Sequence, residues 1–262
     1  MTDQDIQPGR EPLFNMPATV TGLIGALLVV HFVRVFALSP AQDGQVILLF
    51  SFIPIRYSEL ARDFGFPGGV WADIWTPVTY GLLHGSATHL LFNVVWLAAF
   101  GSALARRFGA ARFMAFTVLA TMAGAGAHYL AHSDDMVPVV GASAAISGHM
   151  AAVARFMFQA GGPLRTTRRD PAIWQAEAVS LTGIFADRRV LGFLGVWFGL
   201  NLLFGLGAAP VMGEDVSIAW EAHVGGFVFG LLAFSLFDPP ADERYRRALR
   251  EMQRAESIRR PD

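Results

Sequence analysis

The chain contains no cysteine and no lysine, and it has few charged residues of either sign. The absence of cysteine excludes disulfides, thiol nucleophiles and thiolate metal ligands. Charged residues make up 16% of the 262 residues, whereas a typical soluble domain carries about 25%. Hydrophobic residues make up 53%, and mean hydropathy is +0.43. This composition predicts a protein that is solvated largely by lipid. With a net charge of −1, we expect no nucleic-acid partner.

Acidic residues are almost missing from the apolar stretches of about 20 residues that recur along the chain. Such a length matches a hydrocarbon core of ~30 Å crossed at 1.5 Å per helical residue. Backbone groups in lipid must be satisfied within the segment, and alternating strand patterns are absent, so helices are predicted. The expected fold is an all-α polytopic membrane protein, a bundle of six transmembrane helices over residues 17–38, 82–104, 112–131, 139–158, 190–209 and 218–237.

Arginine supplies all 20 basic residues, and its uneven distribution predicts an orientation. Arginines gather after the second and fourth predicted spans and in the C-terminal tail, whereas the loops 133–138 and 210–217 contain none. The positive-inside rule then places both termini in the cytoplasm. The predicted organisation is a cytoplasmic tail (1–16), a six-helix domain (17–237) with an outer loop (39–81) and a cytoplasmic loop (159–189), and an Arg-rich cytoplasmic tail (238–262).

The two short tails and the absence of a transit-like N-terminus predict a multi-pass protein of the plasma membrane, specifically a bacterial inner membrane.

Ser143 lies in the small-residue segment GASAAISG, near the start of the fourth predicted span. Polar side chains are costly in hydrocarbon and usually serve a purpose there. Many membrane serines only bond to the i−4 carbonyl or bridge neighbouring helices. Near a helix N-terminus, however, a serine has free backbone N–H groups beside it, which can stabilise an oxyanion. Ser143 is therefore a candidate nucleophile.

His223 lies in AHVGGFVFG, where Gly226 and Gly230 form a GxxxG pattern. Gly226 is at i+3 from His223, so the smooth face of the helix and the imidazole point the same way. Packing of that face on the small residues of the fourth span would bring His223 to Ser143. A membrane histidine can also serve only as a hydrogen bonder between helices. We expect a Ser–His dyad in which His223 is the general base and then the general acid.

Both candidates lie near the same membrane face in this topology. Ser143 is four residues and His223 five residues past the predicted starts of their spans. At 1.5 Å per residue, both lie about 6–8 Å below the outer surface. The predicted chemistry therefore takes place near the outer face.

His89 and Asn93 share one face of the second span, because they are spaced i, i+4. They are candidate oxyanion donors, and the alternative is a structural hydrogen-bonded pair. A metal site is the weaker interpretation, because His84 and His89 at i, i+5 point apart on a helix and no HExxH motif is present. We expect no cofactor and no metal. No role is assigned to His31, His128, His132 and His149.

The segments HGSATHLLFN, GASAAISG and AHVGGFVFG, in this order on the second, fourth and sixth spans, closely resemble the rhomboid family of intramembrane serine proteases. The resemblance includes the Gly-x-Ser pattern, which places Gly141 before the serine. It implies an endopeptidase that cuts transmembrane protein substrates within the lipid bilayer. Two other possibilities are an inactive relative that binds transmembrane clients and a transporter, but the retained polar set and the scarcity of intramembrane acids argue against them.

The resemblance also implies a role for each polar residue. Ser143 would be the nucleophile and His223 its base. His89 and Asn93 would join the Ser143 N–H in binding the oxyanion, and His84 would support the outer loop.

Three positions depart from the family pattern. Ala144 replaces a usual glycine, and Ser147 replaces an aromatic that stacks on the histidine. Thr76 replaces the arginine of a Trp-Arg pair, here Trp75-Thr76. The orientation of the histidine is thus left to other neighbours.

Overall fold

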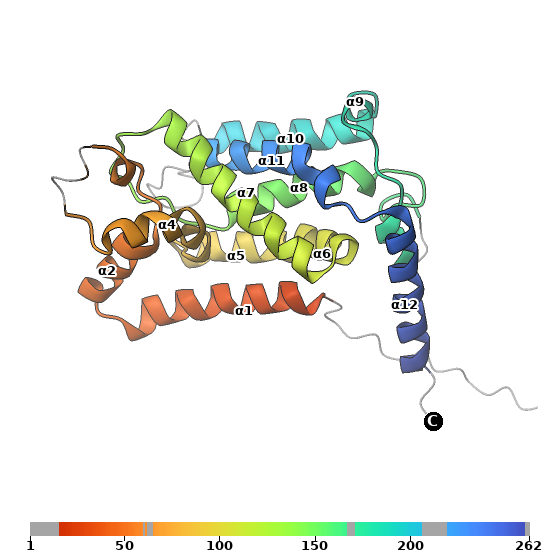
Figure 1. The fold of residues 1–262 in the computed structure, drawn as a ribbon, viewed down its shortest axis with the longest axis horizontal. Helices are drawn as coiled ribbons and strands as arrows, with labels where there is room; N and C mark the ends of the chain where they lie inside the picture. The colour runs from red at the N-terminus through yellow and green to blue at the C-terminus, as the bar shows by residue number, and fades with distance from the viewer. Residues whose placement is uncertain (1–15, 60, 62–64, 167–170, 206–218, 260–262) are drawn as a thin grey trace, which may run out of the picture.

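A computed structural model of the chain describes residues 16–59, 61, 65–166, 171–205 and 219–259. Long helices lie side by side, with short helices at both ends of the bundle (Figure 1). Within the described residues the only extended pairing is a single antiparallel bridge between Phe52 and Val139. The all-helical class expected from the sequence is therefore confirmed.

Four helical segments are long and apolar enough to cross a membrane, and they coincide with four of the predicted spans. The first joins α1 to a π-helical turn, η1, and the second joins α5, η4 and α6 into 22 consecutive residues. Their bounds are α1 Ala18–Phe32, η1 Val33–Ala37, α5 Ala87–Trp96, η4 Leu97–Gly101, α6 Ser102–Phe108, α7 Ala110–Ala131 and α11 Trp220–Phe237.

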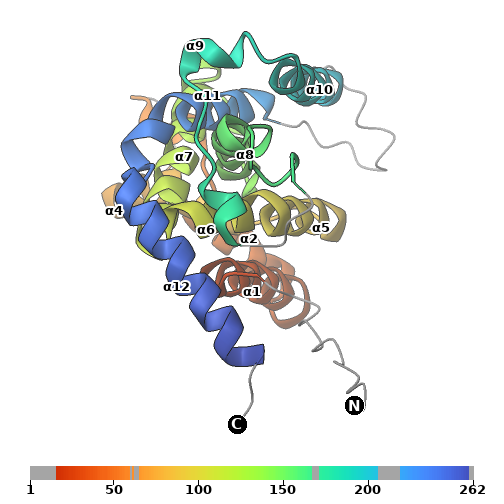
Figure 2. The ribbon, with the colours of Figure 1, turned by 90° about the vertical axis from the view of Figure 1, so that its right-hand side faces the viewer.

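The other two predicted spans are also helices, α8 (Ser143–Met157) and α10 (Arg188–Gly205), but length and composition do not identify them as membrane spans. With 15 residues, α8 is only about 22 Å long. It lies in the middle of the bundle (Figure 2) and buries 12 of those residues, so it meets neighbouring helices instead of lipid. This position explains why α8 tolerates polar residues such as His149.

The predicted start of the fourth span was wrong. Val139 exchanges two backbone hydrogen bonds with Phe52, at 2.8 and 3.1 Å, so residues 139–142 are not helical. Ser143 is consequently the first residue of α8. The sixth helix likewise begins at Trp220 instead of at residue 218. Both candidate catalytic residues are therefore closer to their helix N-termini than the sequence indicated.

The predicted outer loop 39–81 is mostly helical. It contains α2 (Pro40–Phe50), the 3₁₀ turns η2 (Pro54–Tyr57) and η3 (Tyr80–Leu82), and α4 (Gly69–Thr79). In its described residues, the predicted cytoplasmic loop 159–189 contains a 3₁₀ turn, η5 (Pro171–Gln175), the single-turn helix α9 (Leu181–Ile184) and the first two residues of α10.

Helices α7, α8 and α11 pack at backbone distance through small residues. A Cβ atom added to Gly226 would collide with the carbonyl oxygen of Ala144, and one added to Gly230 with that of Gly148. On the α7 side, Gly124 leaves no space for a side chain beside Ala144. This close approach fixes the start of α11 against the start of α8.

A buried arginine connects three segments at the other end of the bundle. Arg107 is fully buried on α6, and its guanidinium donates to both carboxylate oxygens of Asp238, at 2.7 and 2.9 Å. It also donates to the carbonyl oxygens of Trp174 and Ala176. A buried charge that lost these partners would be strongly destabilising, so the network constrains this end of the fold.

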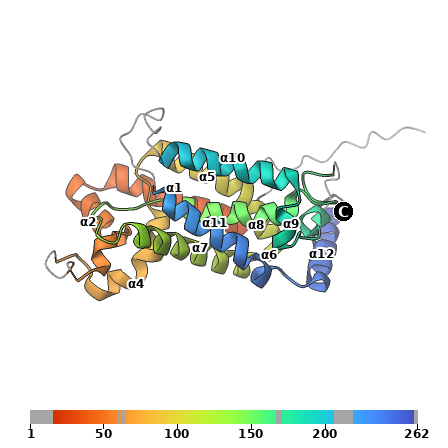
Figure 3. The ribbon, with the colours of Figure 1, turned by 90° about the horizontal axis from the view of Figure 1, so that it is seen from above.

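The Arg-rich tail forms α12 (Ala241–Arg259), which lies at the end of the bundle opposite α2 and α4 (Figure 3). Arg112 of α7 donates two hydrogen bonds, at 2.7 and 2.9 Å, to Glu243. These bonds lower the pKa of Glu243 from 4.5 to about 2. The pair therefore stabilises the docked helix at neutral pH, and the contribution disappears as the pH falls from about 4 toward 2.

The packing of α11 on α8 predicts that added methyl groups destabilise the fold. Gly226→Ala and Gly230→Ala should each lower the free energy of unfolding by about 1–3 kcal/mol, because the new Cβ meets rigid backbone. Gly25→Ala on α1 is the matched control, because nothing lies within 4 Å of its added Cβ. Thermal unfolding in detergent micelles provides the measurement. Equal stability changes for all three variants would contradict the close-packing argument.

Candidate active site

Ser143 is placed by a turn that only glycine accommodates well. Gly141 has φ +126°, and its N–H donates to the carbonyl oxygen of Tyr80 at 3.0 Å. The chain then enters α8 at Ser143, whose N–H belongs to the first helical turn and has no acceptor within the helix. A hydroxyl and a helix N-terminus therefore meet at one point.

His223 lies in the first turn of α11 and contacts Ser143 directly. The His223 Nε2 and Ser143 Oγ atoms are 2.7 Å apart. This distance lies within the range required for a nucleophile and its base. The structure thus brings together the two residues that the sequence singled out on separate helices.

Asn201 of α10 contacts the other side of the imidazole, and the sequence reasoning did not include it. Its Oδ1 atom is 2.6 Å from His223 Nδ1, while its Nδ2 donates to the carbonyl oxygen of Trp197 at 2.8 Å. Because the amide N–H₂ is held by Trp197, the oxygen faces the histidine and accepts from Nδ1–H. Trp197 is itself stacked on Phe227 of α11, with ring centroids 4.1 Å apart.

A sequence signal for Asn201 existed. It is the one polar side chain in the apolar segment VLGFLGVWFGLNLLFG, and a polar group in such a segment usually has a partner. Ser147 cannot stack on His223 as an aromatic residue at that position would. The Asn201 amide holds the imidazole instead.

His89 and Asn93 lie on α5, which begins after its N-cap Ser86; the Ser86 Oγ accepts from the His89 N–H at 3.1 Å. A Cβ atom on Gly141 would lie 2.8 Å from the His89 ring and 3.5 Å from Ser143 Oγ, so both groups flank this glycine. Asn93 donates one amide N–H to the His89 carbonyl oxygen at 3.0 Å. An amide carries a second N–H donor.

His84 lies behind His89 and is buried. The two rings meet edge to face with centroids 5.1 Å apart. Arg34 donates to the His84 carbonyl oxygen at 3.0 Å and forms a two-point contact with Asp43 of α2, at 2.7 and 3.2 Å. The segment that carries His84 is thereby tied to α2 and to the first membrane helix.

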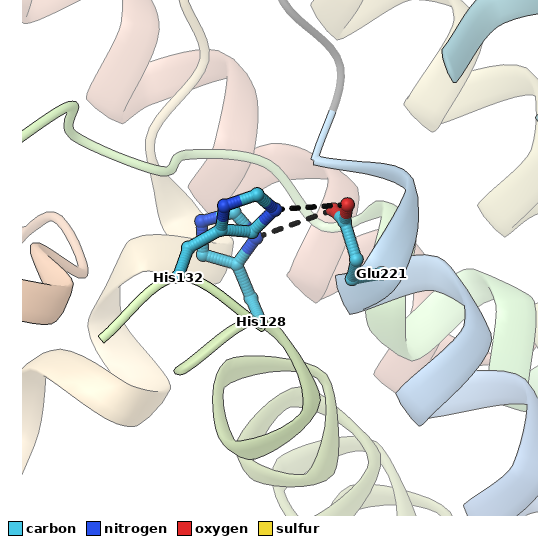
Figure 4. A group of neighbouring side chains, drawn as sticks. All are labelled: His128, His132 and Glu221. Atoms are coloured by element: carbon cyan, nitrogen blue, oxygen red, sulfur yellow. Dashed lines mark hydrogen bonds and ion pairs between the residues drawn. The ribbon is translucent and has the colours of Figure 1, made fainter. Parts of the chain in front are cut away.

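In this arrangement a serine hydroxyl is hydrogen-bonded to an imidazole, the pairing that nucleophilic catalysis requires. Ser143, His223 and Asn201 form one chain of hydrogen bonds, and the His89 ring lies next to Gly141, close to the serine. The Glu221 carboxylate, two residues from His223, contacts His128 and His132 instead (Figure 4). All eight residues predicted for the site lie within the described region: Ser143, His223, His89, Asn93, His84, Gly141, Gly226 and Gly230.

Comparison with known proteins gives matches to one family. The rhomboid domain family matches residues 72–238. A rhomboid protease GlpG of Enterobacter sp. (strain 638) is 26% identical over 236 residues, which cover 89% of this chain and 70% of the relative. The putative rhomboid protease YdcA of Bacillus subtilis (strain 168) is 37% identical over 109 residues, covering 39% of this chain and 53% of that protein. A rhomboid protease GlpG of Yersinia pestis (strain Pestoides F) is 26% identical over 163 residues, covering 62% and 48%.

Proposed function

Because the chain belongs to the rhomboid family, we propose that it is an intramembrane serine endopeptidase that cleaves transmembrane segments of other proteins near the outer membrane face. The observation that carries the proposal is the 2.7 Å contact between Ser143 Oγ and His223 Nε2 across the interface of α8 and α11. Two side chains from different helices meet there in the geometry of general-base catalysis.

In the first step, Ser143 Oγ attacks the carbonyl carbon of the scissile peptide bond, and its proton passes to His223 Nε2. The tetrahedral intermediate then collapses, the C–N bond breaks, and His223 returns the proton to the departing amine. A water molecule, deprotonated by the same nitrogen, hydrolyses the acyl-enzyme. These reaction steps need no cofactor or metal.

Asn201 acts as a positioning residue in this mechanism. By accepting from His223 Nδ1–H at 2.6 Å, it selects the tautomer whose Nε2 is free to accept the serine proton. An orienting hydrogen bond of this kind is what the third member of a catalytic triad supplies in soluble serine proteases.

The oxyanion of the intermediate would be bound by the Ser143 N–H, the second amide N–H of Asn93 and the ring of His89. The Ser143 N–H is a donor at a helix N-terminus, so it lies at the positive end of the α8 dipole, which favours a negative charge. His84 would hold His89 and the outer helices in place through the Arg34 contact.

We further propose six membrane spans, formed by α1 with η1, α5 to α6, α7, α8, α10 and α11. The α9 and α12 end carries most arginines and faces the cytoplasm, so both tails, 1–16 and 238–262, lie there and the domain 17–237 spans the membrane. The starts of α8 and α11 lie at the opposite, outer end together with α2 and α4 (Figures 1 and 3). The bacterial inner membrane is the proposed location, with transmembrane proteins as substrates.

The dyad predicts a non-additive loss of activity. Ser143→Ala and His223→Ala should each abolish cleavage of a model transmembrane substrate in proteoliposomes, and the double variant should be little worse than either. A fluorophosphonate probe should label the parent protein and not Ser143→Ala. Ser147→Ala, one turn further along α8, is the matched control and should retain labelling and cleavage. Labelling and cleavage that persist in Ser143→Ala would overturn the proposed function.

The positioning role of Asn201 predicts a defect in kcat with KM nearly unchanged. Asn201→Leu removes the acceptor and should lower kcat about 10–100-fold, less than the roughly 10⁴-fold effect of altering an orienting aspartate. Asn201→Asp retains an acceptor and should recover most of the rate. Leu202→Ala, a change at an exposed position on the same helix, is the control. If Asn201→Asp and Asn201→Leu were equally impaired, the amide would have only a packing role.

The proposed oxyanion role of Asn93 predicts a loss of kcat without a matching change in KM. Asn93→Ala should lower kcat about 10²–10³-fold, because one donor to the developing charge is lost, while KM changes little. Thermal unfolding measured in parallel separates this effect from a loss of fold. A variant that melts early and regains its full rate at low temperature would show that Asn93 is purely structural.

A further inference from the structure

A second polar cluster lies at the same end of the bundle, outside the hydrogen-bond chain of the active site. It consists of His128 and His132, one helical turn apart at the end of α7, and Glu221 in the first turn of α11 (Figure 4). Glu221 Oε1 is 3.0 Å from His132 Nε2, and Glu221 Oε2 is 3.4 Å from His128 Nδ1. The proposed peptidase mechanism uses none of these three side chains.

The ligand atoms of this cluster already have metal-site spacing. Each residue offers one nitrogen or oxygen, and the three atoms lie within 4.8 Å of one another. Zinc bonds to histidine and carboxylate ligands are about 2.0–2.2 Å long, which places tetrahedral ligand atoms about 3.3 Å apart. The two His–Glu separations, 3.0 and 3.4 Å, are close to this value but involve different carboxylate oxygens, so the three ligand atoms, now within 4.8 Å of one another, would have to draw closer on binding.

Two independent features indicate a ligand at this point. His128 Nδ1 is buried and lacks a hydrogen-bond partner among the described residues, although Glu221 stands in front of it. Behind His132, Asp135 Oδ2 lies 3.3 Å from Nδ1. A carboxylate on the far nitrogen is the usual support of a metal-binding histidine, because it fixes the tautomer that leaves the other nitrogen unprotonated.

We propose that His128, His132 and Glu221 bind one Zn²⁺ ion, with water completing the coordination. Two imidazoles and one carboxylate suit zinc and other late transition metals better than Mg²⁺ or Ca²⁺, which take mainly oxygen ligands. The side chain of His132 is 38% exposed, which provides an entry path from the aqueous side. The site is distinct from the dyad, since Glu221 faces α7 while His223 faces α8 and α10.

The ion would join the end of α7 to the first turn of α11, two residues before His223. In the ion-free form, the polar part of this connection consists of the His132–Glu221 hydrogen bond and the 3.4 Å contact between His128 and Glu221. Zinc binding should therefore stabilise the outer end of the bundle and raise its melting temperature, as any ligand selective for the folded state does.

The test uses the full chain carrying Ser143→Ala, in detergent, after removal of any histidine tag, so that neither proteolysis nor a tag affects the result. Calorimetric titration with ZnCl₂ should give one ion per chain and a higher melting temperature. His128→Ala and Glu221→Gln should each weaken binding by more than about 100-fold, and Asp135→Asn by about 10–100-fold, as expected for an outer-shell carboxylate. Asp134→Ala, an exposed neighbour outside the cluster, should bind as the parent does.

Several results would overturn this proposal. One is zinc binding that survives both His128→Ala and Glu221→Gln. Another is binding that disappears in His223→Ala, which would locate the ion at the dyad. Absence of binding would mean that the three residues only form hydrogen bonds between α7 and α11. Equal affinity for MgCl₂ would mean that the cluster is not a zinc site. If Glu221→Gln fails to fold, Co²⁺ can replace Zn²⁺ as the probe. The visible absorption of bound Co²⁺ should then be lost in Asp135→Asn or His128→Ala, and absorption that persists in both would contradict the site. Because binding is measured without catalysis, failure here leaves the proposed peptidase function intact.

Discussion

The backbone contact between α8 and α11 is the constraint on which the site depends. Gly226 and Gly230 let α11 approach the carbonyl oxygens of Ala144 and Gly148, and a single methyl group at either glycine would separate the helices. Only at this distance does the imidazole of His223 reach the hydroxyl of Ser143. In a membrane, where lipid competes with apolar side chains for every helix surface, such small-residue packing replaces the hydrophobic effect as the source of helix association.

Polar interactions of the described residues are concentrated at the two ends of this packed centre. At the α12 end, Arg107 and Arg112 hold Asp238 and Glu243, so the tail helix is docked and not merely solvated. At the other end, Arg34 joins α2 to the His84 carbonyl group. These polar contacts therefore hold the helices that carry the proposed site in place at both ends of the bundle, as preorganised oxyanion donors require.

The sequence predicted the family correctly, because three short polar motifs in apolar segments kept their order and spacing. It also predicted four long apolar helices that the structure confirms, since helix length and hydropathy are local properties. The expectation for α8 was less accurate: a helix buried among other helices needs neither the length nor the apolar surface of one exposed to lipid. The 139–142 segment was misassigned because its extended form depends on a distant partner, Phe52.

By itself, the sequence determined the membrane character, the helical class and the family, and it singled out Ser143 and His223 as the candidate reactive pair. The tertiary structure decided which groups meet. Asn201 joined His223 because α10 packs beside α11, and His128 and His132 met Glu221 because α7 ends where α11 begins. Contacts of this kind are set by the packing of helices far apart in the chain, and periodicity within one segment carries no information about a partner in another.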